Sequence, residues 1–273
     1  MLSFNAKKQL MKFLSEDIGK GDITSAFLPK KNISARIISR EQAIVAGVKH
    51  AKEIFRLKGC SVRVVKKDGS KIKPDQIIMT ISGDAGKILT CERTALNLLT
   101  RMSGIATQTD ELVKKISNKK TKLYATRKTA PGLRYFDKEA VEIGGGKKHR
   151  LKLDEMVMIK DNHIAASDSL LSLIKSAKRK YKKFEVEVEN TSDAVLAAKE
   201  GATIIMLDNF SPEQIKKTIQ ILKNQKLRGK VMLEASGGIN SKNIAKYGNT
   251  GVDIISVGSI TNSVKGIDMS LEI

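Results

Sequence analysis

Short apolar runs alternate with helix-like stretches through the second half of the chain, from about residue 120 onward. Runs typical of buried strands occur at 122–126, 156–160, 184–189, 203–208, 231–235 and 253–257. Between them, apolar residues spaced three or four apart predict helices at 167–180, 191–200, 212–224 and 240–247. Repeated βα units of this kind predict a parallel sheet covered by helices. An open doubly wound sheet and a closed barrel both fit the alternation.

The first half, residues 1 to about 104, has a different pattern. Strand-like alternation occurs at 35–48, 61–70 and 76–81, and apolar residues at helical spacing run from Thr90 to Ile116. Ser103-Gly104 interrupts that run and predicts a break between two helices. This half therefore predicts a compact α+β unit that is closed by helices.

Polar residues follow each predicted strand of the second half at its C-terminal end. In chain order they are Arg127-Lys128, Lys160 to His163, Glu189-Asn190, Asp208-Asn209, Ser236 to Gly238 and Gly258-Ser259. In an α/β barrel the C-terminal ends of all strands meet on one face, which is where such enzymes carry their active sites. Six polar ends in succession therefore predict a functional site.

The strand FEVEVE at 184–189 refines the picture. Its period of two places Glu185, Glu187 and Glu189 on the face opposite the valines. In a barrel the apolar face packs against helices, so the glutamates would point inward and would require Lys, Arg or a metal ion as partners. A half-exposed antiparallel strand with solvated glutamates is the alternative reading of this pattern.

Two glycine segments near the end of the chain indicate a phosphate site. Ser236, Gly237 and Gly238 follow one predicted strand, and Val257, Gly258 and Ser259 follow the last. Glycine lets backbone N–H groups approach an anion closely, and the loops after the last strands of a barrel are a common phosphate location. The sequence contains neither GxxxxGK[ST] nor GxGxxG, which disfavours nucleoside triphosphates and dinucleotides.

Cations accompany these segments. They lie in TRKT at 126–129, in GGGKKHR at 144–150 and at Lys160. Arg presents a planar fork that matches carboxylate and phosphate, and each charge-assisted bond contributes roughly 1.5–3 kcal/mol. A substrate with several carboxylates, together with a phosphorylated sugar, suits such a site.

Overall charge alone does not identify the function. The 273 residues include 50 Lys and Arg against 29 Asp and Glu, for a formal charge of +21. Lysines predominate and are dispersed, aromatic residues make up 4%, and Trp is absent. A nucleic-acid binder usually concentrates cations on one face and adds aromatic stacking platforms. A solvated, Lys-rich surface is the favoured interpretation, and a non-enzymatic nucleic-acid binder remains the alternative from a different class.

Composition limits the class of protein. With 41% hydrophobic residues the chain can bury a core, and no apolar stretch is long enough for a membrane helix. The N-terminus lacks the features of a secretory signal, and Cys60 and Cys91 form no disulfide framework or zinc motif. We therefore expect a cytoplasmic protein without a membrane or nucleic-acid partner.

Several of these segments together resemble the quinolinate phosphoribosyltransferase family, the carboxylating nicotinate-nucleotide pyrophosphorylases. The matching segments are EDIGKGDITS (16–25), ERTALNLLTRMSGIAT (92–107), TRKTAPGLR (126–134), GGGKKHR (144–150), IKDNHI (159–164), EVEVEN (185–190), IIMLDN (204–209), EASGGIN (234–240) and TGVDIISVGSIT (250–261). They cover nearly the whole chain in order. Departures at Ala125, Ala130, Lys148 and Asn262 remove no residue to which we assign chemistry.

The resemblance implies an α/β fold with two parts. Residues 1–104 would form an N-terminal α/β sandwich domain, joined by a returning C-terminal strand at 267–273. Residues 105–266 would form an incomplete, open α/β barrel with the catalytic site. It also implies a homodimer, or a higher oligomer, in which Arg93 reaches the active site of the partner subunit.

The resemblance further implies an enzyme of NAD biosynthesis that transfers phosphoribosyl from phosphoribosyl pyrophosphate (PRPP) to quinolinate with decarboxylation, using Mg²⁺. The residues that would bind quinolinate are Arg93, Thr126, Arg127, Lys128, His149, Arg150 and Lys160. Glu189 and Asp208 would hold the ribose hydroxyls and Mg²⁺. Phosphate would bind at Ser236, Gly237, Gly238, Val257, Gly258 and Ser259.

A related phosphoribosyltransferase-like protein encoded near molybdenum genes is a second reading within the enzyme class. The intact KDNHI and TRKT segments favour quinolinate over that alternative.

Overall fold

The computed structural model describes residues 4–167 and 169–273. The chain divides into two compact units, each described here by itself. Unit 1 contains the described residues up to Asp110 together with Thr129–Gly145 and Ile260–Ile273, and unit 2 contains Glu111–Lys128 and Gly146–Ser259. Unit 1 therefore includes a segment, Thr129–Gly145, that the sequence-based boundaries place with the barrel.

Unit 1 is built around a four-stranded antiparallel sheet in the order β12-β1-β5-β3. Its strands are β1 (Asn32–Ser39), β3 (Ser61–Val64), β5 (Ile77–Asp84) and β12 (Met269–Glu272). The last strand of the chain pairs with the first, with Arg36 opposite Glu272. A short ribbon of β2 (Ala43–Ile44) and β4 (Lys71–Ile72) adds to the unit. The C-terminus thus closes the N-terminal sheet.

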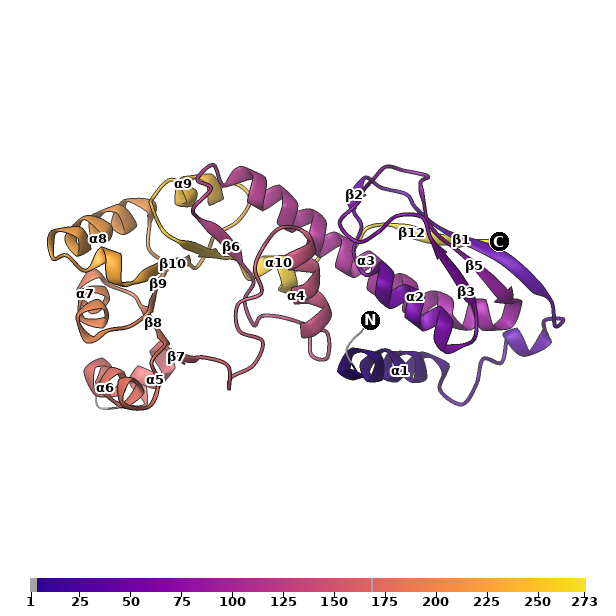
Figure 1. Ribbon diagram of the computed structural model, residues 1–273, viewed down its shortest axis with the longest axis horizontal. Helices are drawn as coiled ribbons and strands as arrows, with labels where there is room; N and C mark the ends of the chain where they lie inside the picture. The colour runs from indigo at the N-terminus through magenta and orange to yellow at the C-terminus, as the bar shows by residue number, and fades with distance from the viewer. Residues whose placement is uncertain (1–3, 168) are drawn as a thin grey trace. The chain divides into compact units, whose positions relative to one another are not determined.

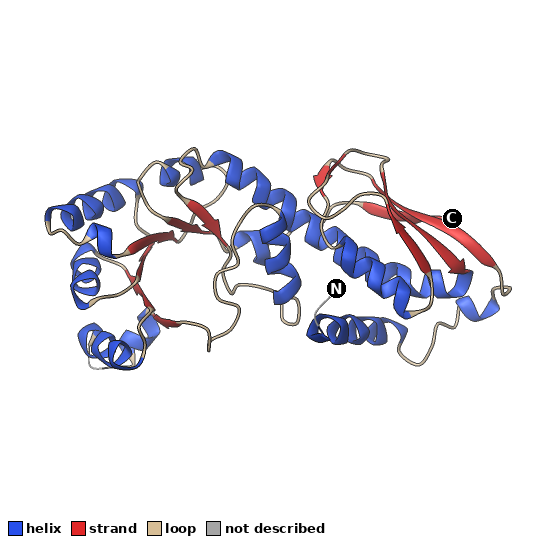
Figure 2. Cartoon of the chain, viewed as in Figure 1, coloured by secondary structure: helices blue, strands red, loops and turns tan. Residues whose placement is uncertain are grey.

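Helices pack on one face of this sheet (Figure 2). Helix α2 (Val48–Leu57) contacts β3, and α1 (Phe4–Ile18) packs against α2. The unit also holds α3 (Ala85–Lys115) as far as Asp110, the 3-10 turn η1 (Ser25–Phe27), α4 (Arg134–Ile143) and α10 (Ser259–Asn262) from Ile260 onward. The predicted strand at 35–48 is divided in the structure: β1 ends at Ser39, β2 takes only Ala43 and Ile44, and Gly47, at φ 94°, turns the chain into α2 at Val48.

The predicted helix break at Ser103-Gly104 is also wrong, since α3 is continuous through both residues. Ser103 turns its hydroxyl to the backbone of Ala46, whose N–H donates to Ser103 Oγ at 3.0 Å. A Cβ on Gly104 would lie 2.0 Å from the carbonyl oxygen of Lys265. The Ser-Gly pair therefore allows other backbone segments of unit 1 to approach the helix closely, which sequence alone reads as a turn.

Unit 2 contains a six-stranded parallel sheet in the order β6-β11-β10-β9-β8-β7. The strands are β6 (Lys122–Tyr124), β7 (Val157–Ile159), β8 (Phe184–Val188), β9 (Ile204–Asp208), β10 (Met232–Ser236) and β11 (Ile254–Ser256). Each lies within a predicted strand or one residue beyond it. The apolar runs of β7, β9 and β11 match strands that are buried on both faces, whereas β8 and β10 carry glutamates among their apolar residues.

Helices lie outside the curve of this sheet (Figure 1). They are α5 (Asp161–Ala165), α6 (Leu170–Lys180), α7 (Thr191–Glu200), α8 (Pro212–Asn224) and α9 (Ile244–Gly248), with the 3-10 turn η2 (Arg228–Lys230). Ser211 and Gln214 form a capping box and Pro212 takes the first position of α8. Helix α9 begins four residues after the predicted start, because residues 241–243 form a turn.

The sheet of unit 2 curves into an open barrel in which β6 and β7 are the two edge strands. Beside β6, the segment around Lys147 runs parallel to the strand, and its amide donates to Leu123 at 2.8 Å. The fold class predicted from the resemblance, an α/β sandwich joined to an incomplete α/β barrel, is confirmed. None of the helices in the described part of the chain has the length and apolar character to cross a membrane.

Replacing Gly104 with Ala tests the close approach inside unit 1. The added methyl would collide with the Lys265 carbonyl, so we expect the free energy of unfolding to fall by about 1–3 kcal/mol. Chemical denaturation measures the change. Gly229→Ala is the matched control, because a Cβ there meets nothing within 4 Å. Equal stability of the two variants would contradict the packing argument.

Candidate active site

A cavity of about 350 Å³ lies at the C-terminal ends of the barrel strands in unit 2. Its size is typical of small-molecule sites. Eight of the residues assigned from the resemblance line it, and they come from segments between residues 126 and 236: Thr126, Arg127, Lys128, His149, Arg150, Lys160, Asp208 and Ser236. Four of the six predicted polar strand ends, those after β6 and β7 and at the ends of β9 and β10, therefore contribute side chains to this cavity.

The other assigned residues do not line this cavity. Arg93 is exposed on α3, and Glu189 is exposed just after β8. The remaining glycine-segment residues, Gly237, Gly238, Val257, Gly258 and Ser259, lie at or just beyond the ends of β10 and β11. The roles of all these residues stay predictions.

Arg127 and Arg150 give the cavity its strongest cationic character. Arg150 is buried, with 9% of its surface exposed, and it donates to the carbonyl of Met156 at 2.9 Å and to the sulfur of Met158 at 3.2 Å. Burial and the neighbouring charge of Arg127 lower the pKa of Arg150 from its usual high value. An anion in this cavity would relieve that repulsion, so the pair favours a substrate carboxylate.

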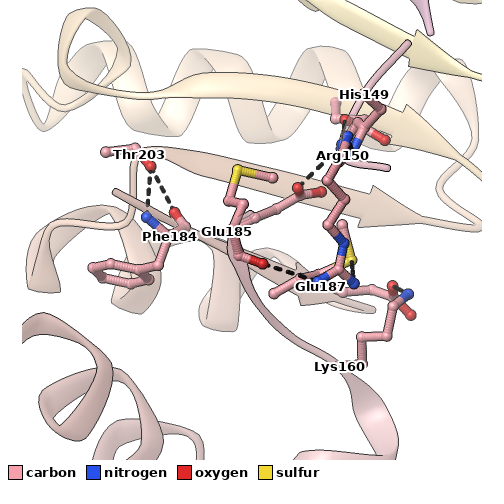
Figure 3. A network of polar contacts seen from close by, with 10 residues as sticks. His149, Arg150, Lys160, Phe184, Glu185, Glu187 and Thr203 are labelled. Atoms are coloured by element: carbon pink, nitrogen blue, oxygen red, sulfur yellow. Dashed lines mark hydrogen bonds and ion pairs between the residues drawn. The ribbon is translucent and has the colours of Figure 1, made fainter. Parts of the chain in front are cut away.

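Lys160 is held by a carboxylate that the residue assignment missed. It follows β7 and forms an ion pair with Glu187 of β8 (Figure 3). Glu187 lines the cavity, whereas Glu189 does not. The alternation of the FEVEVE strand was a sufficient signal for an inward Glu187, and the predicted Lys partner is present. What the sequence could not supply was the point at which the strand ends and the next side chain turns to solvent.

His149 lies between two buried carboxylates. Its Nε2 is 3.3 Å from Glu185 of β8 and 3.5 Å from Glu234 of β10. Both glutamates are 0% exposed. Burial lowers the pKa of His149, but the close contacts with Glu185 and Glu234 and their negative charge outweigh it and raise the pKa to about 9. Glu234 was not among the predicted site residues; it stands at the start of the EASGGIN segment, before the glycine pair to which the phosphate role is assigned.

The two glycine segments pack against other site residues. Gly237 has φ 89°, and a Cβ there would lie 2.2 Å from Oδ1 of Asn209, so only glycine fits. A Cβ on Gly258 would lie 3.0 Å from Cδ of Lys128. Asp208 is opposite Ser236 in the parallel ladder and accepts a hydrogen bond from the Asn209 amide at 2.7 Å. The end of β9 is thereby joined to the first glycine segment.

Two sets of residues contain carboxylates that could bind a metal ion. His149, Glu185 and Glu234 bring their ligand atoms within 4.8 Å of one another, but the raised pKa of His149 favours a proton at this place. Asp208 lines the cavity and Glu189 is solvent-exposed. Mg²⁺ prefers carboxylate oxygens and keeps several waters, a requirement that the half-buried Asp208 and the exposed Glu189 can meet and the fully buried glutamates cannot.

A larger cavity, of about 480 Å³, lies within unit 1. It is lined by Phe13, Glu16, Asp17, Thr94, Asn97, Leu98, Arg101, Pro131 and Leu133. Its one cation, Arg101, is held by a bidentate pair with Asp137 at 2.7 and 2.9 Å. None of the residues assigned to substrate lines it, so the barrel cavity is the candidate active site.

Comparison with known proteins agrees with this geometry. The quinolinate phosphoribosyl transferase N-terminal and C-terminal domain models match residues 22–103 and 105–272. A probable nicotinate-nucleotide pyrophosphorylase [carboxylating] of Archaeoglobus fulgidus is 45% identical over 93% of this chain and 98% of its own. The nicotinate-nucleotide pyrophosphorylase [carboxylating] of Mycobacterium leprae is 38% identical over 98% of this chain and 97% of its own. The solved nicotinate-nucleotide pyrophosphorylase from Francisella tularensis superposes with a TM-score of 0.91 at 38% identity, covering 100% of this chain and 97% of that one. The chain belongs to the quinolinate phosphoribosyltransferase family.

Proposed function

We propose that the protein transfers the phosphoribosyl group of PRPP to quinolinate with decarboxylation, giving nicotinate mononucleotide, CO₂ and pyrophosphate for NAD biosynthesis. The observation that carries the proposal is the single cavity in which Arg127, Lys128, Arg150 and Lys160 gather beside Glu187 and Asp208. The cations of the cavity suit a dicarboxylate, and its carboxylates suit a sugar that develops positive charge.

The cationic side would bind quinolinate. Arg127 and Arg150 offer guanidinium forks, Lys128 and Lys160 offer ammonium groups, and Thr126 offers a hydroxyl. The amide of Lys128 donates to Thr126 Oγ1 at 3.1 Å, which fixes that turn at the edge of the cavity. Together with His149, these groups would orient both carboxylates so that the ring nitrogen faces the sugar.

The reaction would proceed in two stages. First, the ring nitrogen forms a bond to C1 of the ribose as the bond from C1 to the pyrophosphate oxygen breaks, and pyrophosphate leaves with that electron pair. The ring is then a pyridinium cation. Next, the bond from C2 to the 2-carboxylate breaks, CO₂ leaves, and the electron pair left on C2 takes up a proton. The cations must therefore orient the 2-carboxylate without stabilising it so well that its departure slows.

Carboxylates at the ends of β8 and β9 would act on the sugar. Positive charge develops at C1 as pyrophosphate departs, and nearby Glu187 and Asp208 would stabilise it electrostatically. Asp208 and Glu189 would hold Mg²⁺, which supplies charge neutralisation for the pyrophosphate when it is bound. The backbone at Ser236–Gly238 and Val257–Ser259 would take the phosphate groups.

A homodimer completes the proposal. Arg93 is exposed on α3 of unit 1, where a second subunit can reach it. We propose that Arg93 of one subunit binds quinolinate in the barrel cavity of the other, and that the enzyme works in the cytoplasm as a dimer or a higher oligomer.

The decisive assay for this function is direct. Incubation with quinolinate, PRPP and Mg²⁺ should yield nicotinate mononucleotide and CO₂ in equal amounts, measured by chromatography and by release of label from the 2-carboxylate. Nicotinate should be a poor substrate, because it lacks the carboxylate whose loss completes the reaction. Turnover of nicotinate as fast as quinolinate would overturn the decarboxylating assignment.

Changing Glu187 to Gln and changing Glu189 to Gln should affect different kinetic parameters. Glu187→Gln removes a cavity carboxylate, so we expect kcat to fall by about 10²–10³ even at saturating Mg²⁺. Glu189→Gln should instead raise the Mg²⁺ concentration needed for half-maximal rate. Glu111→Gln, an exposed change on α3, is the control. A Glu187→Gln enzyme with normal kcat would remove Glu187 from the catalytic machinery.

Mixing two inactive variants tests the shared site. In the proposed dimer each site uses Arg127 of its own subunit and Arg93 of the other. A hybrid of one Arg93→Ala subunit and one Arg127→Ala subunit therefore contains one site in which both arginines are present. We expect each variant alone to be inactive and the mixture to recover up to about a quarter of the wild-type rate, if subunits exchange freely. Absence of recovery, with exchange shown by differently tagged subunits, would count against Arg93 acting across a dimer.

A further inference from the structure

The His149, Glu185 and Glu234 cluster has more charge than the proposed mechanism uses. The two carboxylates come from β8 and β10 and are 0% exposed, and the ring of His149 is 8% exposed. Among the described residues no hydrogen bond of good geometry reaches the four carboxylate oxygens. His149 and Glu234 line the cavity, and Glu185 lies behind them. Two bare carboxylates would therefore form part of the floor of a site that binds a dianion.

The surroundings of His149 show what can balance these charges. From β6, the ring of Tyr124 meets the imidazole edge-on at a centroid distance of 5.8 Å, and burial raises the pKa of that tyrosine. Arg150, the next residue after His149, places a positive charge that acts to lower the pKa of Glu185. The positive charge of Arg127 in turn acts to lower the pKa of Arg150. Both arginines line the cavity and are assigned to substrate. The imidazole is the group that sits directly between the two carboxylates.

An unprotonated cluster would be unfavourable. Two carboxylates held in a dry interior destabilise the fold unless cationic charge balances them. Burial raises the pKa of Glu185, and the carboxylates together favour any proton that His149 holds. With a neutral His149 that carries a proton on Nε2, the cluster has a charge of two negative units. A second proton, on Nδ1, reduces that charge to one negative unit.

We propose that Glu185 and Glu234 are positioning residues that hold His149 as an imidazolium, so that the floor of the cavity presents a permanent cation to a carboxylate of the substrate. This inference rests on the proposed function, since quinolinate is the dianion in question. Nε2–H would face the two glutamates. Nδ1 would have to leave its contact with the Arg150 amide before Nδ1–H could be offered to the cavity. Binding of the substrate would then require no proton uptake at neutral pH.

One contact in the structure defines the competing state. The amide of Arg150 lies 2.8 Å from Nδ1 of His149, a bond that only an unprotonated Nδ1 can accept. His149 also has φ 53°, in the left-handed region that non-glycine residues seldom occupy. The imidazolium form must therefore turn Nδ1–H away from the Arg150 amide, whereas a neutral ring keeps that bond. The two states differ in the protonation of a single nitrogen.

Nitrogen NMR on the whole protein distinguishes them. The chain contains three histidines, so ¹⁵N-histidine labelling gives a simple spectrum, and the signals missing from a His149→Asn variant identify residue 149. We expect both ring nitrogens of His149 to be protonated at pH 7 and to titrate with a midpoint near 9. An unprotonated Nδ1 at pH 7 in the free protein would overturn the proposal.

Removing the carboxylates should move the charge state and, with it, substrate affinity. In Glu234→Gln, and further in Glu185→Gln/Glu234→Gln, the titration of His149 should shift toward its ordinary value of about 6.5. Quinolinate affinity, measured by calorimetry, should then fall by about tenfold or more between pH 6 and pH 8.5, because the competent form becomes scarce. The wild-type affinity should change less than about threefold over that range.

The controls separate this inference from the function itself. Glu111→Gln should behave as the wild type in both measurements. A merely structural role for the two glutamates would weaken quinolinate binding equally at pH 6 and pH 8.5, and that result would overturn the inference. A wild-type protein that binds quinolinate with a neutral His149 also overturns it while leaving the function intact. Failure of the wild type to bind or convert quinolinate would instead contradict the proposed function.

Discussion

The inward glutamates of the barrel are the constraint on which the site depends. A parallel strand buried on both faces should be apolar, yet β8 turns Glu185 and Glu187 inward, and β10 adds Glu234. A buried carboxylate is unfavourable without a cationic partner. Lys160 and His149 provide those partners. The residue after β7 and the segment beside β6 must therefore carry cationic side chains where they line the cavity.

Much of this arrangement could be predicted from the sequence, because it follows from local periodicity. The βα alternation located all six strands of the barrel, and the Ser211-Pro212 cap located the start of α8. Period-two alternation placed Glu185 and Glu187 inward. The polar residues at the strand ends predicted that Arg127, Lys160 and Asp208 lie on one face, and all three line the cavity. Each of these features is decided by a few neighbouring residues.

The features that escaped prediction depend on segments far apart in the chain. Ser103-Gly104 reads locally as a helix break, and only the approach of Lys265 explains why the helix needs a glycine there. Glu234 precedes a glycine pair that already had an explanation, and its meeting with His149 depends on a loop more than eighty residues earlier. The choice between Glu187 and Glu189 depends on where β8 ends, which no periodicity specifies.

The pairing of cations with protein carboxylates also bears on catalysis. Lys160 and His149 each face glutamates of the protein, so a substrate carboxylate would compete for charges that are already partly satisfied. Its net stabilisation is therefore smaller than four or five bare cations would give. A weaker hold on the ground state is an advantage here, because the 2-carboxylate must leave as CO₂. The glutamates whose burial is unfavourable thus also lower the affinity of the cavity for the substrate carboxylate. This effect arises from the local ion pairs and not from the overall charge of +21.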